Sequence, residues 1–125
     1  MKRDAPRNAS LRDLSAQSEE ASGLHGEASR TGNSRTANAQ YKRIVAAWKE
    51  LRGRGEEGRA ALLRLMGNSN PDVRMWAASH VLEFDPGAAK AELERLASGP
   101  SSLVRFDAEM TLKEWRAGNL KFTDD

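Results

Sequence analysis

The stretch NPDVRMWAASHVLEF (residues 70–84) decides the fold, because its pattern returns 31 residues later as SSLVRFDAEMTLKEW (residues 101–115). The two copies share apolar residues at offsets i, i+4, i+8 and i+11, which form one face of an α-helix. The equivalent pairs are Val73 and Val104, Arg74 and Arg105, Ala77 and Ala108, Val81 and Leu112, and Phe84 and Trp115. Small alanines in the middle of this face predict that two helices approach closely there.

The segments before the two copies also match, with Leu62 and Leu65 equivalent to Leu93 and Leu96. Each repeat unit is therefore a helix pair, over about residues 56–84 and 86–118. One pair is too small to bury its own apolar face, and stacking on a neighbouring pair completes the core. The repeat predicts a short all-α solenoid.

A first helix is expected from an N-cap at Ser10 to about residue 30, although its apolar stripe is thin. The stripe contains Leu14, Ala21, Leu24 and Ala28 and is diluted by serines, so disorder stays an alternative for this segment. Residues 1–9 are expected to be a flexible leader, and residues 10–125 a single helical-repeat domain.

The second helix is expected to begin at residue 33 or 34 and to end at one of the glycines 53 and 55. Its apolar face consists of Tyr41, Ile44, Val45, Trp48 and Leu51. Further helices are expected at about 56–66, 71–84, 86–98 and 102–118, separated by glycine and by Asn-Pro and Asp-Pro pairs. Leu120 and Phe122 of the tail are expected to fold back over the core.

Composition excludes several classes of protein. The 125 residues contain no cysteine, which excludes disulfides, thiol catalysis and cysteine-ligated zinc. The net charge is only +2, and the excess of Lys and Arg lies in the first 59 residues. No signal-peptide pattern and no apolar run of about 18 residues is present, so a cytoplasmic protein without a membrane span is expected.

The segment PDVRMWAASHVL resembles the second helix of a HEAT repeat, whose pattern has an aspartate, then Val-Arg, then paired alanines and a leucine. The resemblance implies a HEAT-like α-α superhelix of about six helices with a 31-residue internal repeat. The second copy has Leu103 in place of Asp72, which departs from the Asp–Arg ladder that HEAT proteins often form.

A closer resemblance covers residues 40–122, through YKRIVAAWKELRGRG, NPDVRMWAASHVLEFDPGAAKAELERLA and FDAEMTLKEWRAGNLKF. These segments are similar to a bacterial family known as domain of unknown function number twenty-nineteen. The resemblance implies a small HEAT-like superhelix. Such domains have been suspected of protecting bacteria against toxins, and the family has no catalytic residues to transfer to this chain.

The strongest candidate for metal chemistry is the H-x-x-E pair of His80 and Glu83, one helical turn apart. A metal site in a helical bundle needs two such units and further carboxylates. The second copy has Thr111 and Glu114 at the equivalent positions. We therefore expect no metal site and no cofactor, with His80 at the edge of the core and one ring nitrogen in water.

Paired carboxylates give no better case for catalysis. Asp107 and Glu109 are two residues apart on a helix and point in different directions. Asp107 is expected to complement the dipole of the first turn of its helix. No catalytic residue is predicted, and the protein is not expected to be an enzyme.

The solvent-facing residues of the second helix in each pair are the predicted binding surface for a protein partner. The predicted contact residues are Arg74, Trp76, His80 and Arg105, with Lys49 and Arg52 at the rim. Structural alternatives are favoured for three of them: a core position for Trp76, and ion pairs for Arg74 and Arg105, which lie at the unfavourable end of the helix dipole.

The predicted function is that of a non-enzymatic protein-binding module, an immunity or antitoxin-type protein that neutralises a toxin. The toxin follows from the family resemblance alone. The alternative is a nucleic-acid-binding accessory protein that uses the basic second helix and its flanks, with Lys42, Arg43, Lys49, Arg52, Arg54 and Arg59. Glu50, Glu56 and Glu57 interrupt this cluster, which makes nucleic acid the less favoured partner. The sequence does not determine an oligomeric state.

Overall fold

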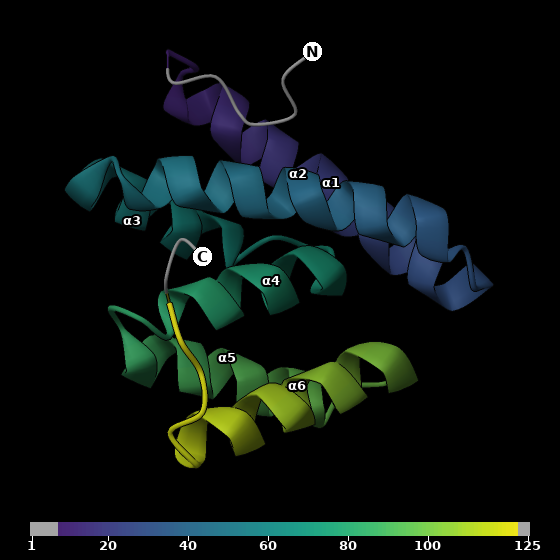
Figure 1. The fold of residues 1–125 in the computed structure, drawn as a ribbon. Coiled ribbons are helices and arrows are strands. Elements are labelled where there is room, and N and C mark those ends of the chain that lie inside the picture. Colours follow the sequence, from purple (N-terminus) through teal and green to yellow (C-terminus); the bar gives the residue numbers. More distant parts are fainter. Residues whose placement is uncertain (1–7, 123–125) are drawn as a thin grey trace.

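The computed structural model describes residues 8–122, which form a stack of helices (Figure 1). The helices are α1 (Leu11–Thr31), α2 (Ser34–Arg52), α3 (Gly55–Leu65), α4 (Pro71–Val81), α5 (Pro86–Ala97) and α6 (Ser102–Arg116). No strand occurs between residues 8 and 122, so the all-α prediction is confirmed. Most of the predicted leader, residues 1–7, and the last three residues of the predicted domain lie outside the described residues.

Side-chain caps start α1, α2, α4, α5 and α6, whereas α3 has none. The Ser10 hydroxyl accepts a hydrogen bond from the Asp13 backbone N–H at 3.0 Å, and Asn33 caps α2 in the same way. Asn70 and Asp85 cap α4 and α5, each followed by proline at the first helical position. These caps satisfy N–H groups that a helix leaves without intrahelical partners. The first segment is therefore helical, and the disordered alternative is wrong.

Two helices are shorter than predicted at their C-terminal ends. α4 ends at Val81, and residues 82–84 form a turn. This turn places Asp85 so that its N–H donates to the Val81 carbonyl at 2.8 Å while its side chain caps α5. α6 ends at Arg116, before Gly118, whose φ of 75° is the left-handed conformation that glycine adopts readily.

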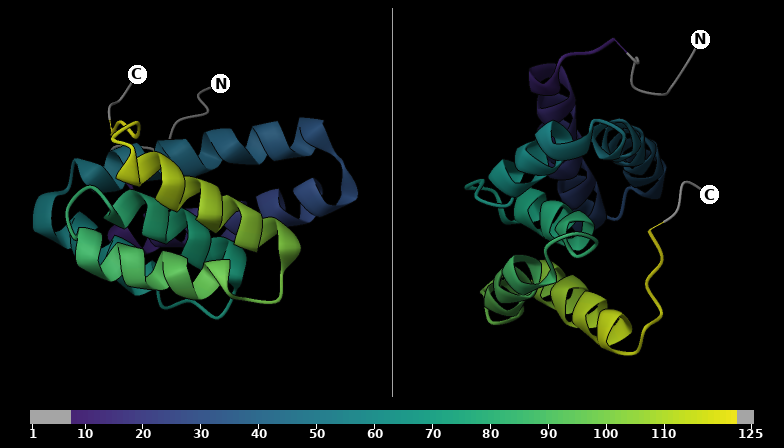
Figure 2. Two further views of the ribbon diagram at one scale, coloured as in Figure 1. Left: turned by 90° about the horizontal axis from the view of Figure 1, so that it is seen from below. Right: turned by 90° about the vertical axis from the view of Figure 1, so that its left-hand side faces the viewer.

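The helices pack in antiparallel pairs along the stack. α1 lies along α2 and also packs on α3 and α4, while α4 packs on α5 and α6. In the end-on view of Figure 2, α2 and α6 lie on one side of the molecule, with α4 between them. The chain after α6, shown in yellow, crosses this side toward α2. α2 and α6 therefore lie on the same side of the stack, and the tail runs between them.

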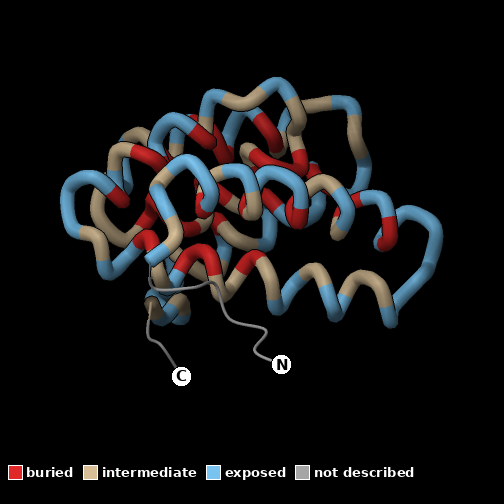
Figure 3. The backbone as a smooth tube through the Cα atoms, turned by 90° about the horizontal axis from the view of Figure 1, so that it is seen from above, coloured by how far each residue is buried: buried red, intermediate tan, exposed pale blue. Residues whose placement is uncertain are grey.

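The core confirms that positions 31 residues apart are equivalent. Val73, Ala77 and Val81 are buried in α4, and Val104, Ala108 and Leu112 are buried in α6. Phe84 and Trp115, the last equivalent pair, are both partly buried against the same core cluster. Figure 3 shows the buried positions in red on the inner sides of the helices.

The buried face of α1 differs from its predicted stripe. Leu14, Ala21 and Ala28 are buried as expected, but Leu24 is 43% exposed. Ser18, Ser22 and Gly26 are buried in its place. α1 thus packs through a face rich in small residues, which lets the neighbouring helices approach closely.

None of the helices within residues 8–122 is long and apolar enough to span a membrane.

Candidate partner-binding groove

A groove of about 560 Å³ opens between α2, α4 and α6, and we call it the aromatic groove. Its size lies within the range of sites that bind small molecules or the side chains of a partner. Its apolar wall comes from three helices that are separate in sequence and consists of Tyr41, Val45, Trp48, Met75, Trp76 and Met110. Tyr41 is 48% exposed and Met110 37% exposed, so much of this apolar wall is open to a partner.

Trp76 is at the centre of the aromatic residues. Its ring centroid lies 5.8 Å from that of Tyr41, 5.3 Å from that of His25 and 6.1 Å from that of His80. The ring is partly buried and lines the groove. The core position that the sequence favoured for Trp76 is therefore wrong, because α2 and α4 leave the ring at the groove wall. Tyr41, predicted on the core stripe of its helix, lies at the same wall.

His80 is part of the core, which corrects the prediction that it lies at the edge with one nitrogen in water. Only 9% of the residue is exposed, and its ring stacks on Trp48 at a centroid distance of 5.0 Å and an interplanar angle of 15°. Its Nδ1 is buried without a hydrogen-bond partner. Burial lowers the pKa of His80 to about 3, because the charged imidazolium would lose its hydration.

The polar wall of the groove contains His25 from α1, Ser79 from α4, and Asp107 and Thr111 from α6. Burial lowers the pKa of His25, and the nearby Asp107 and Asp72 partly oppose this shift. Burial raises the pKa of Asp107. Asp107 lies in the second turn of α6, so the prediction that it serves the first turn is wrong; its carboxylate lies at the groove instead.

The tail supplies the third side of the groove. Leu120 and Phe122 pack against the core cluster, which confirms the prediction that they fold back. Both line the aromatic groove together with Lys121. An occupant of the groove would contact this tail as well as the helices.

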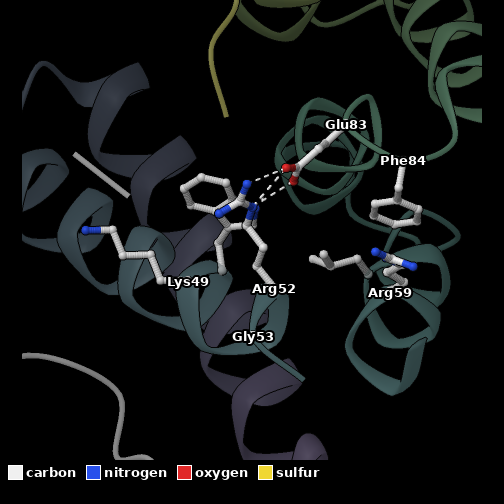
Figure 4. Close-up of a pocket in the computed structure, with 8 residues that line it drawn as sticks. Lys49, Arg52, Gly53, Arg59, Glu83 and Phe84 are labelled. Atoms are coloured by element: carbon white, nitrogen blue, oxygen red, sulfur yellow. Dashed lines mark hydrogen bonds and ion pairs between the residues drawn. The ribbon is translucent and has the colours of Figure 1, made fainter. Parts of the chain in front are cut away.

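A second depression of about 430 Å³ adjoins the groove at the shared residue Trp48, and we call it the basic hollow (Figure 4). The Arg52 guanidinium binds both carboxylate oxygens of Glu83, at 2.6 to 2.9 Å. Arg59 lies over the Phe84 ring, and the Lys49 amine points away from the Arg52–Glu83 pair. The predicted rim residues Lys49 and Arg52 thus lie together beside the groove.

Arg74 and Arg105 do not line the groove. Nε of Arg74 donates to the buried Glu92 at 3.0 Å, and its Nη1 donates to the Asn68 carbonyl at 2.8 Å. Nη1 of Arg105 donates to the Gly99 carbonyl at 3.3 Å. In both repeats the arginine thus binds a carbonyl six residues earlier, after the preceding helix. This contact explains why a cation is tolerated in the first turn, and the favoured ion pair is present for Arg74 with Glu92.

Three of the six residues in the basic cluster of the second helix and its flanks form ion pairs within the molecule. Arg43 pairs with Glu20, Arg54 with Glu50 and Arg52 with Glu83. Glu83, the carboxylate of the H-x-x-E pair, is therefore held by an arginine. Across residues 8–122, no three His, Asp or Glu side chains gather in a way that could hold a metal ion.

The predicted contact residues thus divide into two groups. The structure brings Trp76 and His80 together in the groove, with Lys49 and Arg52 beside it, and places Arg74 and Arg105 elsewhere. Sequence reasoning missed Tyr41, His25 and Asp107 as groove residues. The sequence feature that could have indicated a groove residue is the aromatic side chain of Tyr41 at the edge of the apolar face of its helix.

Comparisons with known proteins agree with this architecture. The family model described as a domain of unknown function, DUF2019, matches residues 13–115. The crystal structure of the protein RPA1889 from Rhodopseudomonas palustris CGA009 is similar, with a TM-score of 0.85 and 26% sequence identity over 94% of this chain and 97% of that chain. A search of the curated proteins found no match. Because the family model covers most of the chain, this protein belongs to the DUF2019 family.

Proposed function

We propose that the protein is a non-enzymatic binding module that docks a partner protein in the aromatic groove. The observation that carries the proposal is the lining of the groove, in which Tyr41, Trp76 and Met110 come from three different helices and remain partly open. Trp, Tyr and Met are enriched at protein interfaces, and aromatic anchors in pockets supply much of the binding free energy. Helical solenoids commonly bind partners along such a continuous face.

The proposed partner is a toxin that the protein neutralises in the cytoplasm. The resemblance to domains suspected of toxin protection supports this choice. Neutralisation by binding requires only a surface that blocks the toxin. Nucleic acid is the less favoured partner, because Arg43, Arg52 and Arg54 already have carboxylate partners in the fold.

The test uses a groove variant that should not disturb folding. Tyr41→Ala removes a ring that is 48% exposed, and Leu63→Ala removes a 37% exposed side chain of α3, away from the groove, as the control. The partner that co-purifies from the native host is titrated by calorimetry with each variant at two salt concentrations. We expect Tyr41→Ala to weaken binding by about tenfold or more and Leu63→Ala to leave it unchanged.

Lys49→Gln at the rim should mainly slow association, with a smaller effect of salt on the rate. Recovery of nucleic acid alone, with affinity that falls steeply with salt for any sequence, would support the alternative partner. Equal losses from Tyr41→Ala and Leu63→Ala would show that the groove is not the docking site.

A further inference from the structure

Asp107 is the acidic side chain among the residues that line the aromatic groove. It lines the groove and also a small cavity behind it, between α1, α4 and α6. Trp76 and His25 line both of these spaces as well. The Asp107 carboxylate and the Trp76 ring therefore border the same volume.

The nearby group whose positive charge would favour the Asp107 carboxylate is His25. Asp72, the other nearby carboxylate, is held by Arg30 at 3.1 Å, and burial keeps His25 toward its neutral form. Within residues 8–122, Asp107 has no hydrogen-bond or ion-pair partner. The Asp107 side chain is exposed at the groove, and partial desolvation there raises its pKa, so a cation from outside the chain can reach the carboxylate and would favour its charged form.

The rings beside this carboxylate favour a cation of a particular kind. Trp76 and Tyr41 lie 5.8 Å apart between centroids, and Phe122 of the tail lines the same groove. The π-faces of aromatic rings attract cations, most strongly where water is excluded. A guanidinium group stacks on such rings and also binds a carboxylate through two parallel hydrogen bonds, whereas an ammonium group is strongly hydrated and acts as a point charge.

We propose that the aromatic groove takes an arginine side chain of the partner protein, which stacks against Trp76 and Tyr41 and donates hydrogen bonds to the Asp107 carboxylate. This inference rests on the proposed docking function and names the chemistry of the anchor that the groove recognises. It also assigns Asp107 as the residue that sets specificity for a cation.

Lys121 is the other charged side chain that lines the groove. It is exposed on the tail and makes no ion pair with Asp107 among the described residues. If the groove takes a cation, Lys121 opposes binding, and its removal strengthens the complex. If the groove takes an anion, Lys121 is the anchor and its removal weakens the complex.

The experiment titrates the full-length protein with the peptide acetyl-Gly-Arg-Gly-amide and with the same peptide carrying citrulline. Citrulline keeps the shape of arginine and lacks its charge. The readout is the shift of the tryptophan indole N–H resonances in NMR spectra. Trp76 reports on the groove, while Trp115, which does not line it, is an internal control.

We expect the arginine peptide to bind about tenfold more tightly than the citrulline peptide, with the Trp76 resonance moving and that of Trp115 unchanged. Asp107→Asn should reduce this preference to about twofold or less. Glu109→Gln, which neutralises an exposed carboxylate on the same helix, should keep it. Lys121→Gln should strengthen arginine binding.

Equal binding of the two peptides, an unchanged preference in Asp107→Asn, or no shift of Trp76 at the highest soluble peptide concentration would overturn the arginine proposal. Docking in the groove would then still be supported if Tyr41→Ala weakens binding of the whole partner. Conversely, arginine preference with no effect of Tyr41→Ala on the partner would contradict the docking function and leave the arginine site in place.

Discussion

At the scale of single residues, His80 acts as a neutral aromatic ring. It stacks on Trp48, lies close to Trp76, and has its Nδ1 buried without a partner. Burial lowers its pKa from 6.5 to about 3, so between these two pH values the imidazole is neutral in the folded protein and charged in the unfolded chain. Protons therefore bind the unfolded chain in preference to the folded one.

This linkage predicts a loss of stability in mild acid. Because the folded pKa lies below the unfolded one, the full stability is present above pH 6.5 and is lost as the pH falls toward 3. Between pH 7 and pH 5 the free energy of unfolding should fall by roughly 2 kcal/mol through this residue. His80→Phe keeps a planar ring and should remove most of that fall, as measured by urea unfolding at several pH values.

His25→Gln is the matched control, because this histidine is more exposed and its pKa is lowered less. The variant should keep most of the dependence on pH. If His80→Phe and the parent protein lose the same stability between pH 7 and pH 5, the imidazole is not held neutral by the core.

Trp76 and His80 show what helical spacing can and cannot predict. Their separation of four residues places them on one face of α4, and the structure brings both to the groove. Which of the two side chains is covered depends on the side chains that neighbouring helices place against it. Trp48 of α2 covers His80, while Tyr41 covers Trp76 only in part, and neither contact can be derived from the sequence of α4.

At the scale of helices, α1 and α4 meet at Gly26. A Cβ atom at Gly26 would lie 2.2 Å from an Asp72 carboxylate oxygen, closer than any real contact. That carboxylate is buried and is held by Arg30 of α1. The glycine makes room for a partly buried ion pair that joins the two helices.

Gly26→Ala should therefore destabilise the protein by roughly 1–3 kcal/mol, because the Asp72 carboxylate must move and lose its partner while buried. Helix propensity alone predicts the opposite, a gain of about 1 kcal/mol from alanine. Thermal and urea unfolding of the variant decide between the two effects.

Gly23→Ala provides a control in the same helix. Its nearest neighbour would be the Asn70 amide at 3.4 Å, which is an ordinary van der Waals distance. This variant should be neutral or gain up to about 1 kcal/mol. A gain for both variants would mean that α1 and α4 do not approach as closely as described.

The helices themselves were largely predictable from the sequence. The caps at Ser10, Asn33 and Asn70 and the 31-residue pairing of Val73 with Val104 are local signals, and the structure confirms them. The face of α1 was not predictable in the same way. Its small residues are buried because other helices approach closely. A hydrophobic-periodicity pattern counts serine and glycine as breaks in the apolar stripe, so it does not predict their burial.

At the scale of the molecule, the groove is a product of stacking. Its walls combine His25, Tyr41, Trp76, Asp107 and Phe122, which lie on α1, α2, α4, α6 and the tail. No local pattern joins positions so far apart in the chain. The sequence could therefore predict that α4 contributes to the proposed binding surface, whereas the position of Asp107 at the groove follows only from the fold.

Oxidative footprinting of the protein, free and bound to the partner from its native host, tests the central claim that this groove is the docking site. Hydroxyl radicals label exposed side chains, and Tyr41 and Met110 are exposed in the groove, while Leu24 and Leu63 are exposed outside it. Binding should protect Tyr41 and Met110 and leave Leu24 and Leu63 unchanged. Protection of Leu24 or Leu63 with Tyr41 and Met110 still labelled would contradict the account.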